Sequence, residues 1–98
     1  MPKYVIEREV PGAGNWSPEE LRQVAIKSNG VITDLESQIV WQQSYITGDK
    51  IFCVYIAPNE EIVRRHAELS GFPANRINRV AAVIDPATAE KNKEPALN

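Results

Sequence analysis

Chemistry in this 98-residue chain would rest first on its single histidine, His66, and its single cysteine, Cys53. Imidazole and thiolate are soft ligands for nickel, copper or zinc, and histidine is also a common general acid or base. No HxxxH, CxxC or HExxH spacing occurs. A metal site would therefore need ligands from separate elements or from two chains, and we predict His66 and Cys53 as its candidate ligands.

Both residues also have a purely structural interpretation. His66 would then be a buried histidine that hydrogen-bonds to a neighbour, and Cys53 would be a small buried apolar residue within a strand. If a ligand pocket lies beside His66 instead, we expect Tyr55 and Ser44 to line it together with Cys53. Glu7 is a further candidate for that pocket.

The composition and the remaining motifs exclude several function classes. Eleven Lys and Arg against thirteen Asp and Glu give a net charge of -2, and the signs are interspersed, which argues against nucleic acid and anionic membranes as partners. No apolar run approaches the roughly 20 residues that span a bilayer, so we expect a cytoplasmic protein. The glycine-rich segment 12–14 lacks the lysine of a phosphate-binding loop and is interpreted as a hinge. No serine-hydrolase pattern is present.

Apolar periodicity predicts four strands and two helices. A period of two covers residues 3–10, 39–47, 50–57 and 77–84, and a period of 3.6 covers about 18–35 and 60–70. Ser17 and Glu20 form the pattern of a capping box, and Asn59 and Gly71 are expected to bound the second helix. The order βαββαβ predicts a ferredoxin-like α+β sandwich with both helices on one face of an antiparallel sheet.

One domain is expected at residues 1–86, because the chain is long enough for a single core. Residues 87–98 are polar and rich in lysine and glutamate, so we expect a flexible tail there.

The predicted hairpin has two apolar faces. A two-residue turn at 48–49 places Ser44 opposite Cys53 and Gln42 opposite Tyr55. The helix-free face would then carry Trp41, Tyr45, Phe52 and Val54. Because an exposed aromatic sheet face favours association, we expect a homodimer through this face, similar to a dimeric α+β barrel.

Six segments together resemble one known family. They are MPKYVIER (1–8), SPEEL (17–21), WQQSY (41–45), CVYIAP (53–58), HA (66–67) and GFPA (71–74). The chain resembles the bacterial domain of unknown function 4242, whose members are often labelled nickel-binding protein. The resemblance covers roughly residues 2–88 and implies a ferredoxin-like fold, a homodimer built on sheet packing and a nickel-related role. It makes His66 the family-like position that is also a metal-ligand candidate.

Three functions follow as hypotheses. The first is a homodimeric protein that binds nickel or another transition metal through His66 and Cys53. The second is a small-molecule-binding protein, or a cofactor-independent enzyme of the dimeric α+β barrel type with His66 as acid or base. The third is a structural or regulatory dimer without a ligand.

Overall fold

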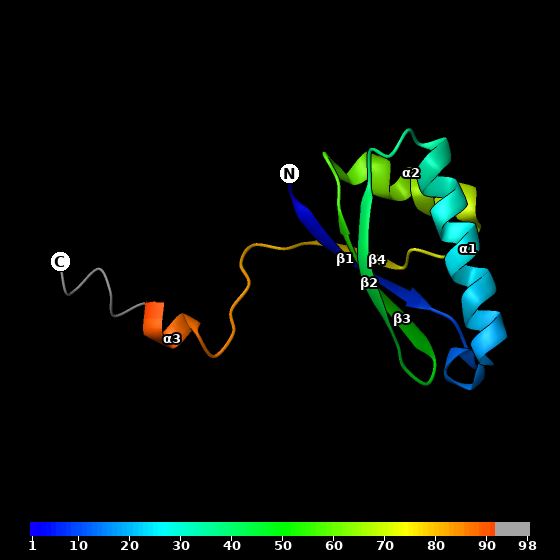
Figure 1. Ribbon diagram of the computed structural model, residues 1–98, viewed down its shortest axis with the longest axis horizontal. Coiled ribbons are helices and arrows are strands. Elements are labelled where there is room, and N and C mark those ends of the chain that lie inside the picture. The colour runs from blue at the N-terminus through cyan, green and yellow to red at the C-terminus, as the bar shows by residue number, and fades with distance from the viewer. Residues whose placement is uncertain (92–98) are drawn as a thin grey trace.

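Two long helices cover one face of a four-stranded antiparallel sheet, as predicted. The structure, a computed structural model, describes residues 1–91. In chain order, the elements are β1 (Lys3–Glu9), the 3-10 helix η1 (Ala13–Asn15), α1 (Pro18–Asp34), β2 (Val40–Ile46), β3 (Lys50–Ile56), α2 (Glu60–Ser70), β4 (Arg76–Arg79) and α3 (Thr88–Lys91). Figure 1 shows α1 and α2 on the same side of the sheet, with α3 away from it.

The strand order β2-β3-β1-β4 is that of a ferredoxin-like sandwich. The fourth strand is shorter than predicted, because β4 ends at Arg79 instead of continuing to residue 84. Its last ladder bond runs from the Val80 N–H to the Lys3 carbonyl, at 2.8 Å. Lys3 is the first residue of β1, and the residue before it, Pro2, directs its carbonyl to the Ala57 N–H on the β3 side of the sheet. The length of β4 is therefore set by its partner and not by its own apolar run.

Local capping defines both long helices where it was predicted. The Ser17 side chain accepts from the Glu20 N–H at 3.1 Å, and the Glu20 carboxylate accepts from the Ser17 N–H at 3.0 Å. Asn59 caps α2 by accepting from the Ile62 N–H at 3.0 Å. Gly71 ends α2 with φ of 77°, a conformation that glycine adopts without strain.

The β2–β3 hairpin follows the predicted register up to a β-bulge. Ser44 lies opposite Cys53, as expected. The register then shifts between Trp41 and Gln43, so Trp41 and not Gln42 lies opposite Tyr55. A bulge places two residues against one on the partner strand and turns the following side chains to the other face.

Burial explains why the bulge forms. Trp41 is half-buried on the helix-covered side, and its indole N–H donates to Ser44 Oγ at 2.9 Å, whereas Gln42 stays exposed. Without the bulge, an amide would occupy the inner position and the indole would face outward. Ile39 is buried and Val40 exposed for the same reason. The prediction that Trp41 lies on the helix-free face was therefore wrong.

The glycine-rich segment before α1 is docked and does not form the expected hinge. The Gly14 N–H donates to the Gly48 carbonyl at 3.0 Å, and the Gly12 N–H donates to the Asp49 carboxylate at 3.0 Å. A Cβ at Gly14 would lie 2.8 Å from the Thr47 carbonyl oxygen, so glycine permits this close approach. The start of α1 is thereby held against the tip of the hairpin.

The core lies between the helices and the sheet. Its buried residues include Tyr4, Ile6, Ile39, Ile51, Tyr55, Val63 and His66. The alternation of β1 also turns Arg8 toward this layer, where it is 2% exposed. A charged side chain is therefore part of the interior.

The chain beyond β4 leads away from the sheet (Figure 1). Residues 80–87 form no helix or strand, and the side chains of Val83 and Ile84 are 69% and 79% exposed. Residues 88–91 form α3, and the rest of the predicted tail, 92–98, lies outside the described residues. Within residues 1–91, every helix falls short of the length and apolarity needed to span a membrane.

Candidate functional site

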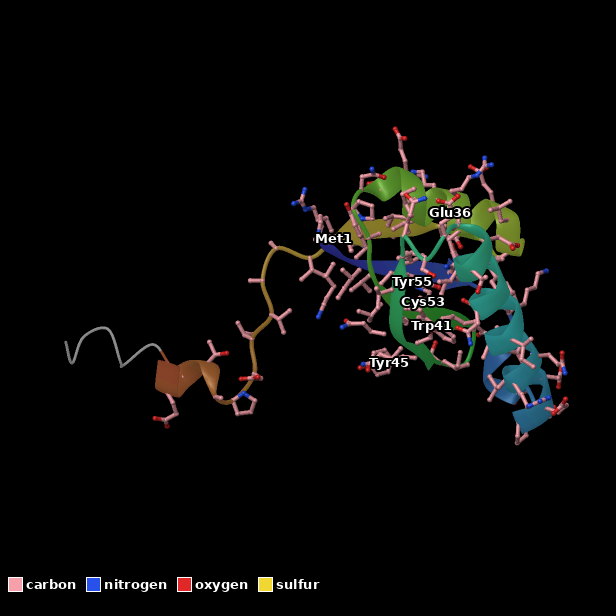
Figure 2. All side chains as sticks on the ribbon, turned by 45° about the horizontal axis from the view of Figure 1, so that its top comes forward. Met1, Glu36, Trp41, Tyr45, Cys53 and Tyr55 are labelled. Carbon is pink, nitrogen blue, oxygen red and sulfur yellow. The ribbon has the colours of Figure 1, made fainter. Side chains whose placement is uncertain are left out.

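A cavity of about 190 Å³ lies between α1 and the helix-covered face of the sheet. Its wall includes the predicted pocket residues Ser44, Cys53 and Tyr55, together with Trp41, which the bulge turns inward. Figure 2 shows Trp41, Cys53 and Tyr55 beside α1, whereas Tyr45 points away from that helix. The structure thus brings three of the predicted residues into one site.

Arg8 is the charged group of this cavity, and sequence reasoning missed it. Its guanidinium donates to the Pro73 carbonyl at 2.8 Å, to Tyr55 Oη at 3.4 Å and to Cys53 Sγ at 3.4 Å. The ion pairs formed by residues 1–91 are Glu19–Arg22, Glu7–Lys50 and Glu60–Arg64. The positive charge of Arg8 is therefore buried without a carboxylate partner in the described part of the chain. The inward alternation of Tyr4, Ile6 and Arg8 was the signal that could have revealed it.

Tyr55 is a neutral phenol at the inner end of the cavity. Burial and the neighbouring Cys53 raise the pKa of Tyr55 to about 12, although Arg8 opposes this shift. The phenol oxygen accepts from Arg8, so the hydroxyl keeps its own hydrogen for another acceptor. Tyr55 is thus an uncharged polar group in the wall of the cavity.

His66 is fully buried behind the cavity wall and links three elements. Its Nε2 lies 3.2 Å from Ser28 Oγ on α1, and its ring lies 5.1 Å from the Tyr55 ring on β3. Burial and then the charge of Arg8 lower the pKa of His66, against an interaction with Ser28 that raises it. The imidazole is therefore neutral near pH 7, and its Nδ1 has no hydrogen-bond partner among residues 1–91.

The placement of Glu7 corrects a prediction. Strand alternation turns Glu7 to the helix-free face, where its carboxylate pairs with Lys50 Nζ at 2.9 Å. Glu7 and the cavity are therefore on opposite faces of the sheet, and Glu7 contributes no charge to the pocket.

The donor set of one chain does not fit a resident nickel ion at His66 and Cys53. In the described residues, no group of three or more His, Cys, Asp or Glu side chains lies together. The Cys53 sulfur already accepts from Arg8, whose positive charge opposes a cation at that position. Of the two predicted ligands, only His66 has a donor atom without a partner in the described residues, its Nδ1. A single donor atom is too few to hold a divalent ion.

We predict that His66 makes the stability of the protein depend on pH. Folding lowers the pKa of His66 below 6.5, the usual histidine value. Below pH 6.5, the histidine is therefore protonated in the unfolded chain before it is protonated in the folded protein. The stabilisation is complete above that pH and is lost as the pH falls through the folded pKa, by at most about 1.4 kcal/mol per pH unit. Urea unfolding between about pH 7.5 and 5 measures this loss.

His66→Gln is the matched control, because glutamine can still bond to Ser28 but does not titrate. The difference between the two proteins isolates His66 from the carboxylates, which titrate in both. We expect the variant to lose less stability between these pH values. Equal losses in both proteins would contradict a neutral, buried His66.

Comparison with known proteins supports the fold and identifies the family. The model of the family described as "Nickel responsive protein SCO4226-like" matches residues 4–80. The crystal structure of SCO4226 from Streptomyces coelicolor A3(2) has a TM-score of 0.71 and 20% identity, over 84% of this chain and 99% of that chain. At this identity, the structural likeness confirms the fold alone.

None of the curated proteins matches the chain. The expectation of a nickel-related family is confirmed. The assignment to domain of unknown function 4242 stays a prediction. Since the family model spans residues 4–80, this chain belongs to the SCO4226-like family of nickel responsive proteins.

Proposed function

We propose that this protein binds a small organic molecule in the cavity beneath α1. The observation that carries the proposal is a partly open pocket of about 190 Å³ lined by both apolar and polar side chains. An engineered cavity of about 150 Å³ is large enough to bind benzene. Drug-sized ligands need about 300 Å³ or more, so the expected ligand has roughly the size of one aromatic ring.

The cavity has an apolar end and a polar end. The docked segment before α1 holds the start of that helix at the hairpin tip, and Leu21 near that start and Ile51 near that tip both line the cavity. One or more turns later, Ser28 contacts His66, which packs against Tyr55. The polar groups of α1 and β3 therefore meet at the same end, and a ligand with one polar group would bind in a single orientation.

The position of His66 supports binding more than catalysis. Ser28 and Tyr55 line the cavity, and His66 lies behind them as their hydrogen-bonding and packing partner. A general acid or base must reach the reacting atom directly or through one water. His66 is better placed to hold the wall than to exchange protons with a ligand.

Benzyl alcohol, a neutral aromatic molecule, is a suitable probe for the pocket. Nuclear magnetic resonance can follow the indole N–H of Trp41, which lies in the wall, with Trp16 as an internal reference outside it. We expect saturable shifts of the Trp41 signal. Ala25→Phe fills the cavity from α1 and should weaken binding at least about tenfold, because the ring occupies the ligand space.

The matched control is Ile26→Phe, which adds a ring to the same helix at an exposed position. It should bind benzyl alcohol as the wild type does. An unshifted Trp41 signal at saturating probe, or equal binding by Ala25→Phe, would sink the pocket proposal.

We further propose that a second copy covers the helix-free face of the sheet and forms a homodimer. This face carries the exposed ring of Tyr45 and a groove of about 750 Å³, whose wall includes Val5, Val54 and Val83. Val83 comes from the exposed segment after β4, so the groove joins the sheet face to an apolar arm. Apolar surfaces of this kind favour association.

Sedimentation velocity tests the dimer with Val54→Asp. A carboxylate in the middle of the proposed interface would be buried without a partner, so the variant should sediment as an 11.0 kDa monomer. Leu69→Asp, at an exposed apolar position on α2, is the control and should remain dimeric. A wild-type monomer at tens of micromolar would refute the assembly.

Nickel binding is the second candidate function. It is favoured by the family description and by the unpartnered Nδ1 of the buried His66. Imidazole and thiol groups are suitable nickel donors. A nickel ion at His66 and Cys53 would need to replace the Arg8 contact to the sulfur and to recruit further donors.

Isothermal titration of tag-free protein with nickel chloride tests this candidate. Saturable binding in the wild type should disappear in His66→Gln and weaken in Cys53→Ser, because each variant removes one proposed donor. Unchanged affinity and stoichiometry in His66→Gln would place any nickel site elsewhere in the protein.

A further inference from the structure

We propose that the cavity beneath α1 selects a small monocarboxylate, with Arg8 as its counter-charge. This inference rests on the proposed binding function and names the chemical class of the ligand.

The charge of Arg8 is uncompensated among the described residues. The side chain is 2% exposed and lines the cavity. Its contacts are the Pro73 carbonyl, the Tyr55 hydroxyl, the Cys53 sulfur and the face of the Phe72 ring, 6.0 Å from its centroid. A buried cation of this kind is costly unless an anion pairs with it. A negatively charged ligand would supply the missing partner.

The wall of the cavity also holds hydrogen-bond donors that the protein leaves unused. Arginine has five N–H groups, and Arg8 directs three of them to the protein atoms above. Ser44 accepts from the Trp41 indole, so its hydroxyl keeps a hydrogen to donate. Unused donors in one wall are complementary to an anion.

The lining of the cavity limits the charge and shape of that anion. Arg8 is the cationic side chain in the wall, and the wall is otherwise mainly apolar, with Leu21, Val24, Ile46 and Ile51 among its residues. A dianion such as phosphate would bring a second charge without a partner. The planar guanidinium matches the two oxygens of a carboxylate. An apolar body attached to one carboxylate therefore fits both ends of the cavity.

The experiment compares benzoate with two neutral molecules of similar size, benzamide and benzyl alcohol. Affinities are measured on the full chain from the Trp41 indole signal, near pH 7.5 and at constant ionic strength. We expect benzoate to bind at least about tenfold more tightly than either neutral probe. Inorganic phosphate, at the same ionic strength, should bind more weakly than benzoate.

Two variants test the role of Arg8. Arg8→Met removes the charge, and the ratio of benzoate to benzamide affinity should fall to about one. Arg8→Lys keeps the charge but loses the planar fork, so the ratio should fall and yet remain above one. Circular dichroism checks that each variant folds. If Arg8→Met does not fold, the wild-type ratio and Arg8→Lys still decide the question.

The outcomes separate this inference from the binding function on which it rests. Binding of benzyl alcohol with no preference for benzoate would overturn the carboxylate inference and leave the pocket in place. Failure of all the aromatic probes would overturn the pocket itself. Tighter binding of phosphate than of benzoate, or an unchanged ratio in Arg8→Met, would also overturn the assignment of a monocarboxylate to Arg8.

Discussion

The burial of the Arg8 guanidinium is the constraint on which the site depends. A cation in the interior needs acceptors, and this one takes them from two different parts of the chain: β3 supplies Cys53 and Tyr55, and the segment after α2 supplies the Pro73 carbonyl. Each of these groups must therefore stay in place for the charge to stay inside. The same charge lowers the pKa of His66 and so helps to keep the neighbouring imidazole neutral.

His66 connects the two helices to the part of the sheet that surrounds Arg8. The imidazole joins Ser28 of α1 to the ring of Tyr55 on β3, and it belongs itself to α2. The two helices and the sheet thus meet at one uncharged ring directly behind the cavity. The hydrogen bond to Ser28 fixes the orientation of the imidazole, because hydrogen bonds have direction and apolar contacts do not.

Features with a local cause were predictable, and features that depend on a distant partner were not. The caps of α1 and α2 involve neighbouring residues, and the two-residue turn sets the register of the hairpin as far as Gln43, so Ser44, Cys53 and Tyr55 could be assigned to one side of the sheet. The end of β4 depends on where β1 stops offering partners, which its own apolar run does not reveal. The inward position of Arg8 follows from the alternation of β1, but a charged residue is normally assigned to the surface.

The β-bulge in β2 decides which residue of that strand lines the cavity opposite Tyr55. Residues 43–46 are paired by the turn and keep their faces, whereas the residue opposite Tyr55 is chosen by whether one extra residue is accommodated before Gln43. Loss of the bulge with all residues kept would place Gln42 opposite Tyr55 in place of the Trp41 indole, without any change at Arg8, Cys53 or Tyr55. Loss of the extra residue together with the bulge would instead leave Trp41 opposite Tyr55 in a regular ladder. The bulge therefore lets the hairpin gain or lose one residue at this point while the same side chain lines the cavity.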